Sequence, residues 1–313
     1  MLRADSVVCP ELNEHPRDKF MSSKRMFQAP EISRYRVGEF AVTVLSDGSL
    51  DGSFDMLEGI DNDEVLSLLI AANVSSLPRM FINAFIVEIG TQTILIDGGA
   101  GNINGWGGRL VPAMVAAGYD PLQIDTILLT HGHSDHVGGL AGPLATKHFR
   151  NVKKVFLHRA ELNFWRDDEA RKVASADYQR LFDVACNVLD AYQQQLTPFE
   201  DGDVLLPGIT AVHLPGHTPG HSGYLLESEG DSLLVWGDIL HFPYIQVARP
   251  DVTFAFDYTP DLAAKTRRKI LTELSQNGRY VTGVHFNAPV RAIIETLGDS
   301  FQIFYEQQSR DVD

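Results

Sequence analysis

Residues 130–136 read THGHSDH and place four potential metal ligands within six positions: His131, His133, Asp135 and His136. The preceding run DTILLT at 125–130 predicts a strand, so these side chains lie at a strand-to-loop junction. Gly132 permits unusual backbone angles, and we expect a tight turn there to direct the first two side chains to one point and the last two to a neighbouring point. Three imidazoles and a carboxylate packed together cost desolvation energy unless a cation neutralises them, although any one loop histidine is usually solvated. The chain must therefore fold so that a metal centre forms at the end of a strand.

Three further segments supply the additional ligands that such a centre needs. His217 lies in LPGHTPGH after the predicted strand ITAVHL, Asp238 ends the predicted strand DSLLVWGD, and His285 ends RYVTGVH. Three histidines with a carboxylate make one site, and an aspartate with two histidines and the same carboxylate makes a second. Asp238 is then the natural bridge between two divalent ions about 3.5 to 4 Å apart. Histidine-rich ligation favours zinc, with manganese, cobalt or iron as alternatives that depend on availability.

Short apolar runs alternate with helical patterns along most of the chain. The apolar runs predict strands at 40–45, 83–90, 92–99, 125–130, 154–158, 209–214, 222–228, 231–238, 279–285 and 301–305. Helical patterns occupy 107–118, 159–165, 175–195 and 260–277, and residues 65–74 suit an amphipathic helix. Two strand-rich halves separated by a helical segment predict an α/β fold of two packed sheets with helices outside. The same periodicity also fits an open doubly wound sheet.

The composition is that of an ordinary globular protein, with 44% apolar and 21% charged residues. Residues 1–33 are polar and without a sustained period, so we expect an N-terminal arm followed by a single domain at 34–313. Cys9 and Cys186 are far apart and predict free thiols rather than a disulfide framework. The first residues lack the apolar core of a secretory signal, and no apolar run approaches the roughly 20 residues of a membrane span. We therefore expect a cytoplasmic protein that is not embedded in a membrane.

The charge balance restricts the partners. The chain has 26 lysines and arginines against 41 acidic residues, which gives a formal net charge of −15. A field of this sign repels phosphate backbones and anionic lipid surfaces. We therefore expect a small neutral substrate and no nucleic-acid partner, and a homodimer is compatible with the sequence.

HGHSDH together with PGHTPGH, the Asp that ends LLVWGD and the late VH resembles the metallo-β-lactamase superfamily, with the motifs in the usual order from about residue 35 onward. The resemblance implies a four-layer αβ/βα sandwich of two mixed sheets. It also implies that Asp238 bridges two metals, with three ligands for the first ion and three for the second: His131, His133 and His217, then Asp135, His136 and His285. Asp97 in LIDGG matches an early aspartate that supports the ligand loop without binding metal.

Within the superfamily, GEFAVTVLSDG, NAFIVEIG, ILIDGGAG and GDIL look most like the branch of methyl parathion hydrolase and the N-acyl homoserine lactonases. The resemblance implies a hydrolase in which a hydroxide that bridges two metals attacks a lactone or ester, with Asp135 and Asp238 in the catalytic machinery. Asp238 or a metal-bound water would then protonate the leaving group. The lactonases commonly carry a tyrosine three residues beyond the bridging aspartate, whereas this chain has His241.

Two rival reactions remain open. A phosphotriester hydrolase would use the same two-metal chemistry, because hydroxide attacks phosphorus as readily as carbon. A persulfide dioxygenase with one iron would leave Asp135, His136 and His285 partly idle, and one iron per chain with sulfite formation would identify it.

Several other residues near these motifs have structural interpretations. His221 closes GHTPGH and is expected to stabilise the turn or support a ligand. Core packing is the favoured role for each of the nearby aromatic residues, with a substrate wall as the alternative: Trp106, Phe164, Trp165 and Phe242. The glycine-rich run at 98–108 lacks the lysine and hydroxyl residue of a phosphate-binding loop, so we expect a flexible loop beside the metals.

Overall fold

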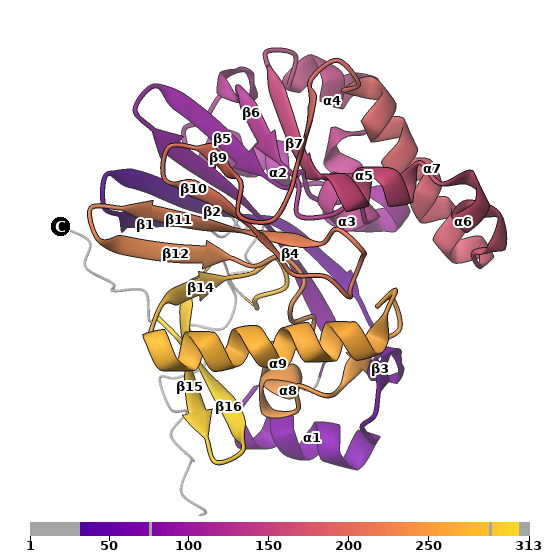
Figure 1. Ribbon diagram of the computed structural model, residues 1–313, viewed down its shortest axis with the longest axis vertical. Coiled ribbons are helices and arrows are strands. Elements are labelled where there is room, and N and C mark those ends of the chain that lie inside the picture. The colour runs from indigo at the N-terminus through magenta and orange to yellow at the C-terminus, as the bar shows by residue number, and fades with distance from the viewer. Residues whose placement is uncertain (1–31, 75–76, 288–289, 307–313) are drawn as a thin grey trace, which may run out of the picture.

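The computed structural model describes residues 32–74, 77–287 and 290–306. Within these residues two mixed sheets pack face to face and helices cover their outer faces (Figure 1). The predicted four-layer α/β sandwich is confirmed, and an open doubly wound sheet is excluded. Most of the predicted N-terminal arm, including Cys9, lies outside the described residues.

The first sheet contains seven strands within the described residues, in the spatial order β1-β2-β4-β5-β6-β7-β8. These strands are β1 (Ile32–Val37), β2 (Phe40–Asp51), β4 (Arg79–Ile89), β5 (Gln92–Ile96), β6 (Thr126–Leu128), β7 (Lys154–His158) and β8 (Leu196–Phe199). The pairs up to β5 are antiparallel, and the pairs from β5 to β8 are parallel. Parallel strands place the loops that follow β5 and β6 at the same edge of the sheet.

The second sheet also has seven strands in the part of the chain that the structure describes, in the order β16-β15-β14-β12-β11-β10-β9. They are β9 (Val204–Leu206), β10 (Ile209–His213), β11 (Ser222–Ser228), β12 (Asp231–Val235), β14 (Tyr280–Thr282), β15 (Ala292–Leu297) and β16 (Ser300–Tyr305). Only β12 and β14 are parallel among the described pairs. A small antiparallel pair joins β3 (Leu57–Glu58) to β13 (Thr253–Phe254).

Nine α-helices are described, and most follow a strand on the outer side of one sheet. They are α1 (Asn62–Ala71), α2 (Leu110–Ala116), α3 (Ser134–Val137), α4 (Gly142–His148), α5 (Arg159–Trp165), α6 (Asp168–Val173), α7 (Ala176–Ala191), α8 (Pro243–Ala248) and α9 (Pro260–Asn277). Figure 1 shows α9 lying across the second sheet, while α4 to α7 gather at the first. Among these residues no helix combines the length and apolar composition that a membrane span requires.

Three apolar layers hold the sandwich together. The central layer joins the facing sides of the two sheets, with Phe85 and Ile96 from the first against Tyr224 and Val235 from the second. A second layer lies between the first sheet and its helices, and a third lies between the second sheet and α9. Successive strand residues point to opposite faces, so that Leu233 lies in the central layer and Leu234 in the outer one.

The predicted strands match the observed ones, but several end earlier than expected. Asp97 follows β5 directly, Asp238 lies three residues after β12, and His285 lies three residues after β14. The backbone leaves the strand at these points because Asp97 has φ 59° and Gly237 has φ 57°, both in the left-handed region. The freed segments carry their side chains to a single edge of the sandwich.

Strand β8 was not predicted. Its sequence LTPF contains Pro198, which cannot donate a hydrogen bond to a neighbouring strand. The strand lies at the edge of the first sheet, where a proline is tolerated.

Candidate metal centre

The loop after β6 carries four of the predicted ligands and is fixed by Asp97. One carboxylate oxygen of Asp97 accepts a hydrogen bond from the Thr130 amide at 2.8 Å, and the other accepts from the Thr130 hydroxyl at 2.8 Å and from His136 Nδ1 at 2.9 Å. Asp97 is buried beneath the loop. It therefore has the supporting position that the resemblance implied.

Gly132 lies in this loop for a reason different from the one predicted. It is not among the glycines of the described residues with positive φ. A Cβ atom at this position would lie 2.3 Å from the indole nitrogen of Trp165. Close approach of the Trp165 ring, rather than an unusual backbone angle, therefore requires glycine between His131 and His133.

His131, His133 and His217, the first ligand group, converge in the structure. His133 Nδ1 lies 2.9 Å from His131 Nε2 and 2.9 Å from His217 Nε2. His131 and His133 come from the loop after β6, whereas His217 comes from the loop after β10 in the second sheet. All three side chains are buried.

Asp135, His136 and His285, the second ligand group, meet beside the first. The Asp135 carboxylate lies 3.6 Å from His136 Nε2 and 3.5 Å from His285 Nε2. This group also combines the loop after β6 with a segment of the second sheet, the one that follows β14. Ligand atoms in each of these sets lie within 4.8 Å of one another, close enough to share an ion.

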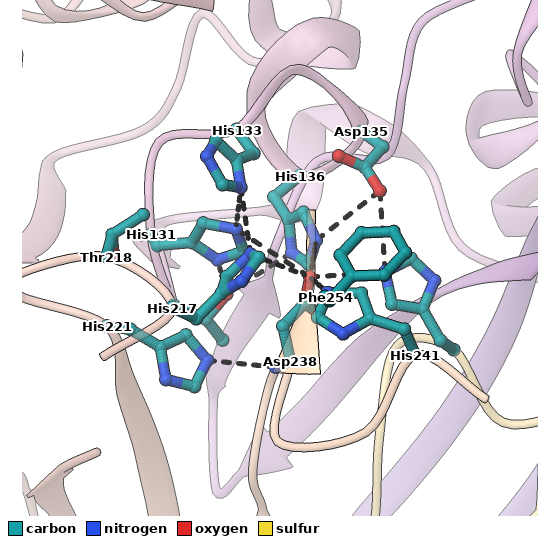
Figure 2. A network of polar contacts seen from close by, with 12 residues as sticks. His131, His133, Asp135, His136, His217, Thr218, His221, Asp238, His241 and Phe254 are labelled. Carbon is teal, nitrogen blue, oxygen red and sulfur yellow. Dashed lines mark hydrogen bonds and ion pairs between the residues drawn. The ribbon is translucent and has the colours of Figure 1, made fainter. Parts of the chain in front are cut away.

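Asp238 lies between the two groups, as Figure 2 shows. Its Oδ2 atom is 3.4 Å from His217 Nε2 on one side and 3.2 Å from both His136 Nε2 and His285 Nε2 on the other. The structure therefore brings together all seven residues that the sequence indicated, with Asp238 in the shared position.

Each histidine of the two groups turns one ring nitrogen inward and bonds the other nitrogen outward. The outward partners are the Thr130 hydroxyl for His131, the Tyr178 hydroxyl for His133, Asp97 for His136, Asp257 for His217 and the Phe81 carbonyl for His285. Such outer contacts fix the ring orientation and place the proton on the outward nitrogen. The inward nitrogens then face one another with their lone pairs.

This donor set fits divalent cations. The inward nitrogens of the first group lie only 2.9 Å apart, and two unprotonated nitrogens at this distance repel each other. Four ligands placed tetrahedrally around Zn²⁺, with bonds of about 2.0 Å, are separated by about 3.3 Å. The observed separation is therefore close to the one that a shared zinc ion requires. Three buried atoms of the cluster have no hydrogen-bond partner among the described residues: His136 Nε2, Asp238 Oδ1 and His241 Nε2. Buried polar atoms are nearly always satisfied, and a bound ion with its water would satisfy them.

The electrostatics agree with this conclusion. Burial lowers the pKa of His131 and of His133 well below the usual value, so both rings stay neutral and able to ligate. Burial alone would raise the pKa of Asp238, but His136 and His285 hold it well below its usual range. Burial would also lower the pKa of His136 and of His285, but the Asp238 carboxylate raises both, that of His136 well above its usual value. The cluster therefore surrounds the Asp238 anion with positive charge, a role that a divalent ion would fill.

His241 is a further member of the cluster that the sequence placed only by its distance from Asp238. Its Nε2 lies 3.3 Å from Asp238 Oδ2, and its ring stacks on Phe254 with centroids 4.0 Å apart. Burial lowers the pKa of His241 to about 4, so the ring is neutral near pH 7.

Asp257 and Glu161 are supporting residues that sequence reasoning missed. Asp257 accepts from His217 Nδ1 at 2.8 Å and from the Phe254 amide at 2.9 Å. Burial would raise the pKa of Asp257, but the contact with His217 lowers it to about 2. His221, which was predicted to stabilise a turn or a ligand, donates to the Leu214 carbonyl and accepts from the Asp238 amide. No local motif marks Asp257 or Glu161 as a support for metal ligands, because their contacts with the ligand loops form only through the fold.

A cavity of about 160 Å³ opens beside the cluster. Its walls are mainly apolar: Leu50, Met56, Met80, Trp106, Leu181, Phe254 and Phe256. No described residue that lines it is a lysine or an arginine. Trp106 is thus part of a wall, whereas Phe164, Trp165 and Phe242 are buried in the apolar layers.

The glycine-rich loop that carries Trp106 is held by a buried carboxylate. Asp47 accepts hydrogen bonds from the amides of Ala100, Gly108 and Leu110 at 2.7 to 3.0 Å. A Cβ atom at Gly107 would lie 2.0 Å from this carboxylate, which explains the glycine there. The loop is a cradle for Asp47 rather than for a phosphate.

Solved structures resemble this fold closely. The hydrolase AbOPH of the beta lactamase superfamily is 30% identical, with a TM-score of 0.84 over 90% of this chain and 99% of that one. AidC, a dizinc quorum-quenching lactonase, is 23% identical with a TM-score of 0.83 over 89% of this chain and 98% of that one, a likeness that concerns the fold.

Sequence comparison leads to the same group of proteins. An N-acyl homoserine lactonase of Bacillus cereus is 25% identical over 197 residues, which are 56% of this chain and 69% of that protein. The chain spans only 34% and 46% of the length of two other curated relatives. Residues 77–283 match the family model of the metallo-beta-lactamase superfamily. With this match and the fold described above, the chain belongs to the metallo-beta-lactamase superfamily.

Proposed function

We propose that this protein is a binuclear metal-dependent hydrolase of neutral lactones or esters. The observation that carries the proposal is the position of Asp238 Oδ2 between two separate ligand groups, each completed by residues of both sheets. The first ion would be held by His131, His133 and His217, the second by Asp135, His136 and His285, and Asp238 would be shared. Zinc is the first choice, because imidazole nitrogen dominates both groups.

Two bound divalent ions supply Lewis-acid catalysis and lower the pKa of water from 15.7 towards about 7. The side chains of the protein position these ions and the substrate. Asp238 is the group proposed to pass a proton to the leaving oxygen: as an anion it would first accept that proton from the attacking water, and its Oδ1 is buried without a hydrogen-bond partner among the described residues. His241 is neutral and can donate one N–H to the substrate from its place beside Asp238.

The cavity supports a neutral substrate with an apolar arm. Trp106, Phe254 and Phe256 offer aromatic surface for an acyl or aryl group, and burial of that group contributes about 25 cal/mol per Å². A carboxylate on the substrate, as in a cephalosporin, would find no cationic side chain on the described walls. The similarity to N-acyl homoserine lactonases supports lactones as the first choice.

Aryl phosphotriesters are a second candidate, favoured by the same uncharged, aromatic walls. A phenol leaves with little protonation, so this reaction would depend less on a proton from Asp238. Lactone hydrolysis produces an alkoxide that needs the proton. Lactones remain the first choice because of the similarity to N-acyl homoserine lactonases.

A substrate panel with matched metal forms tests the proposal. Zinc, manganese and cobalt forms would be assayed on γ- and δ-lactones, aryl esters, aryl phosphotriesters and a cephalosporin, with metal content measured in the same samples. We expect close to two ions per chain and highest turnover on lactones. Cephalosporin turnover without lactone or triester turnover would refute the substrate class, and one iron per chain with sulfite formation would indicate a persulfide dioxygenase.

A further inference from the structure

Helix α5 places a buried carboxylate behind the metal centre. Glu161 lies in the first turn of this helix and is 0% exposed. It forms no ion pair with a cationic side chain among the described residues, and burial raises its pKa. A buried carboxylate in this position must be stabilised by hydrogen bonds.

Four donors provide that stabilisation. Glu161 Oε1 accepts from the Gly132 amide at 3.0 Å and from the Trp165 indole at 2.5 Å. Glu161 Oε2 accepts from the Thr218 hydroxyl at 2.7 Å and from the Gly220 amide at 2.9 Å. Each oxygen thus has two donors, a pattern that satisfies a buried carboxylate.

The donors belong to the two loops that carry the first ligand group. Gly132 lies between His131 and His133 in the sequence. Thr218 directly follows His217, and Figure 2 shows it close to that histidine. The glycines permit this approach: a Cβ atom at Gly220 would lie 2.3 Å from the Glu161 amide nitrogen. One carboxylate therefore joins a loop of the first sheet to a loop of the second, next to all three histidines.

The second ligand group has a different support. Asp97 binds Thr130 and His136, and the Phe81 carbonyl accepts from His285. Glu161 makes no described hydrogen bond to a residue adjacent to Asp135 or His285. Glu161 can thus be changed without loss of a described hydrogen bond to the second group, whereas Asp97 also reaches His131 through the Thr130 hydroxyl.

We propose that Glu161 is a positioning residue that clamps the two loops of the first ligand group and so sets the affinity for the ion bound there. This inference rests on the proposed function only in assuming that the ligand groups hold metal. Preorganised ligand loops bind an ion without first being ordered, and outer-shell partners of this kind change metal affinity by about 10- to 100-fold. The carboxylate also places a negative charge behind the loops of this group.

Glu161→Gln tests the clamp with little change in shape. Glutamine has an amide nitrogen where glutamate has its second oxygen. This nitrogen cannot accept hydrogen bonds, so two of the four donors lose their acceptor and the two loops are no longer held together by one carboxylate. Metal-free wild type and variant would be titrated with Zn²⁺ in competition with a chromophoric chelator. We expect one binding event to weaken about 10- to 100-fold and the other to stay unchanged. Thr218→Val removes a single donor and should give a smaller weakening of the same event.

Two matched variants complete the experiment. Asp97→Asn should weaken the other binding event more strongly, because Asp97 bonds His136 directly and reaches His131 only through the Thr130 hydroxyl. Glu200→Gln removes a carboxylate that is 56% exposed and should change neither. Circular dichroism of each metal-free protein would test whether the variants remain folded.

Unchanged affinity for both ions in Glu161→Gln would overturn the inference, as would a larger effect of Glu161→Gln on the binding event that Asp97→Asn weakens most. The measurement uses metal affinity alone, so it stands even if no lactone, ester or phosphotriester is hydrolysed. If the wild type binds a single ion, the binuclear proposal fails, and the inference survives only if Glu161→Gln weakens that ion.

Discussion

The two ligand groups use similar side chains but have different surroundings. The first consists of three histidines whose loops meet at Glu161, and its outward nitrogens bond to Thr130, Tyr178 and Asp257. The second includes its own carboxylate, Asp135, which is 14% exposed and lines the cavity. Both groups reach the cavity, the first through His133 and His217 and the second through Asp135 and His285, and Asp135 is the most exposed of these side chains.

This difference shows where each group obtains negative charge. The first group has only the shared Asp238 as a direct carboxylate and relies on Asp257 and Glu161 behind it. The second has Asp135 as a ligand in addition to Asp97 behind His136. If each group binds a divalent ion, a carboxylate ligand would balance its charge in the second group, and carboxylates behind the histidines would do so in the first.

The largest expected effect comes from removing the residue that the groups share. Asp238→Ala leaves the surrounding imidazoles without their central anion, so we expect loss of both ions and a fall in hydrolysis by several orders of magnitude. Elemental analysis after dialysis and the rate on the best lactone measure these effects. Asp168→Ala, at an exposed position on α6, is the control. Two retained ions in Asp238→Ala would show that the groups do not share it.

Removing one ligand from each group separates the two. His131→Ala should lose the first ion and Asp135→Ala the second, and each should abolish hydrolysis because both ions are needed. Both variants should stay folded, since a core of this size does not depend on metal. Elemental analysis measures the loss of each ion, circular dichroism shows whether the variants are folded, and lactone turnover measures the loss of hydrolysis. Near-normal turnover in either variant would contradict the ligand assignment.

The smallest expected effect concerns the start of α5, which carries Glu161. His158 Nδ1 accepts from the Ala160 amide at 3.1 Å, and its ring stacks on His213 at 4.2 Å with Glu200 3.9 Å away. Burial lowers the pKa of His158, and His213 lowers it further, while Glu200 opposes the shift. The unfolded chain then binds more protons in the window between the folded pKa and about 6.5.

The contribution of His158 to stability is therefore complete above about pH 6.5 and is lost as the pH falls through the folded pKa. His158→Asn keeps a capping acceptor that does not titrate, so the free energy of unfolding should depend less on pH in this window. Urea titrations of both metal-free proteins between pH 5 and pH 8, a range chosen around the value of about 6.5, measure the difference. Parallel pH dependences would exclude this role of His158.

Much of the fold follows from local patterns. The predicted helix at 260–277 has the observed bounds of α9, because a proline opens it and Gly278, with φ 65°, ends it. The edge strand β8 was missed because Pro198 is unfavourable in a sheet unless the strand is at the edge. Whether a strand lies at the edge depends on its neighbours and cannot be seen in its own sequence.

The sequence alone determined the ligand set, because HGHSDH and the motifs around His217, Asp238 and His285 have donor types that have little other use when clustered. Only the tertiary structure decided what surrounds them. Glu161 lies 29 residues from Gly132 and 57 from Thr218, and Asp257 lies 40 from His217. Every residue except proline has a backbone amide, so a carboxylate that accepts from backbone amides leaves no recognisable sequence motif in its partners. These groups come together because the two sheets pack against each other, and that packing depends on the whole chain.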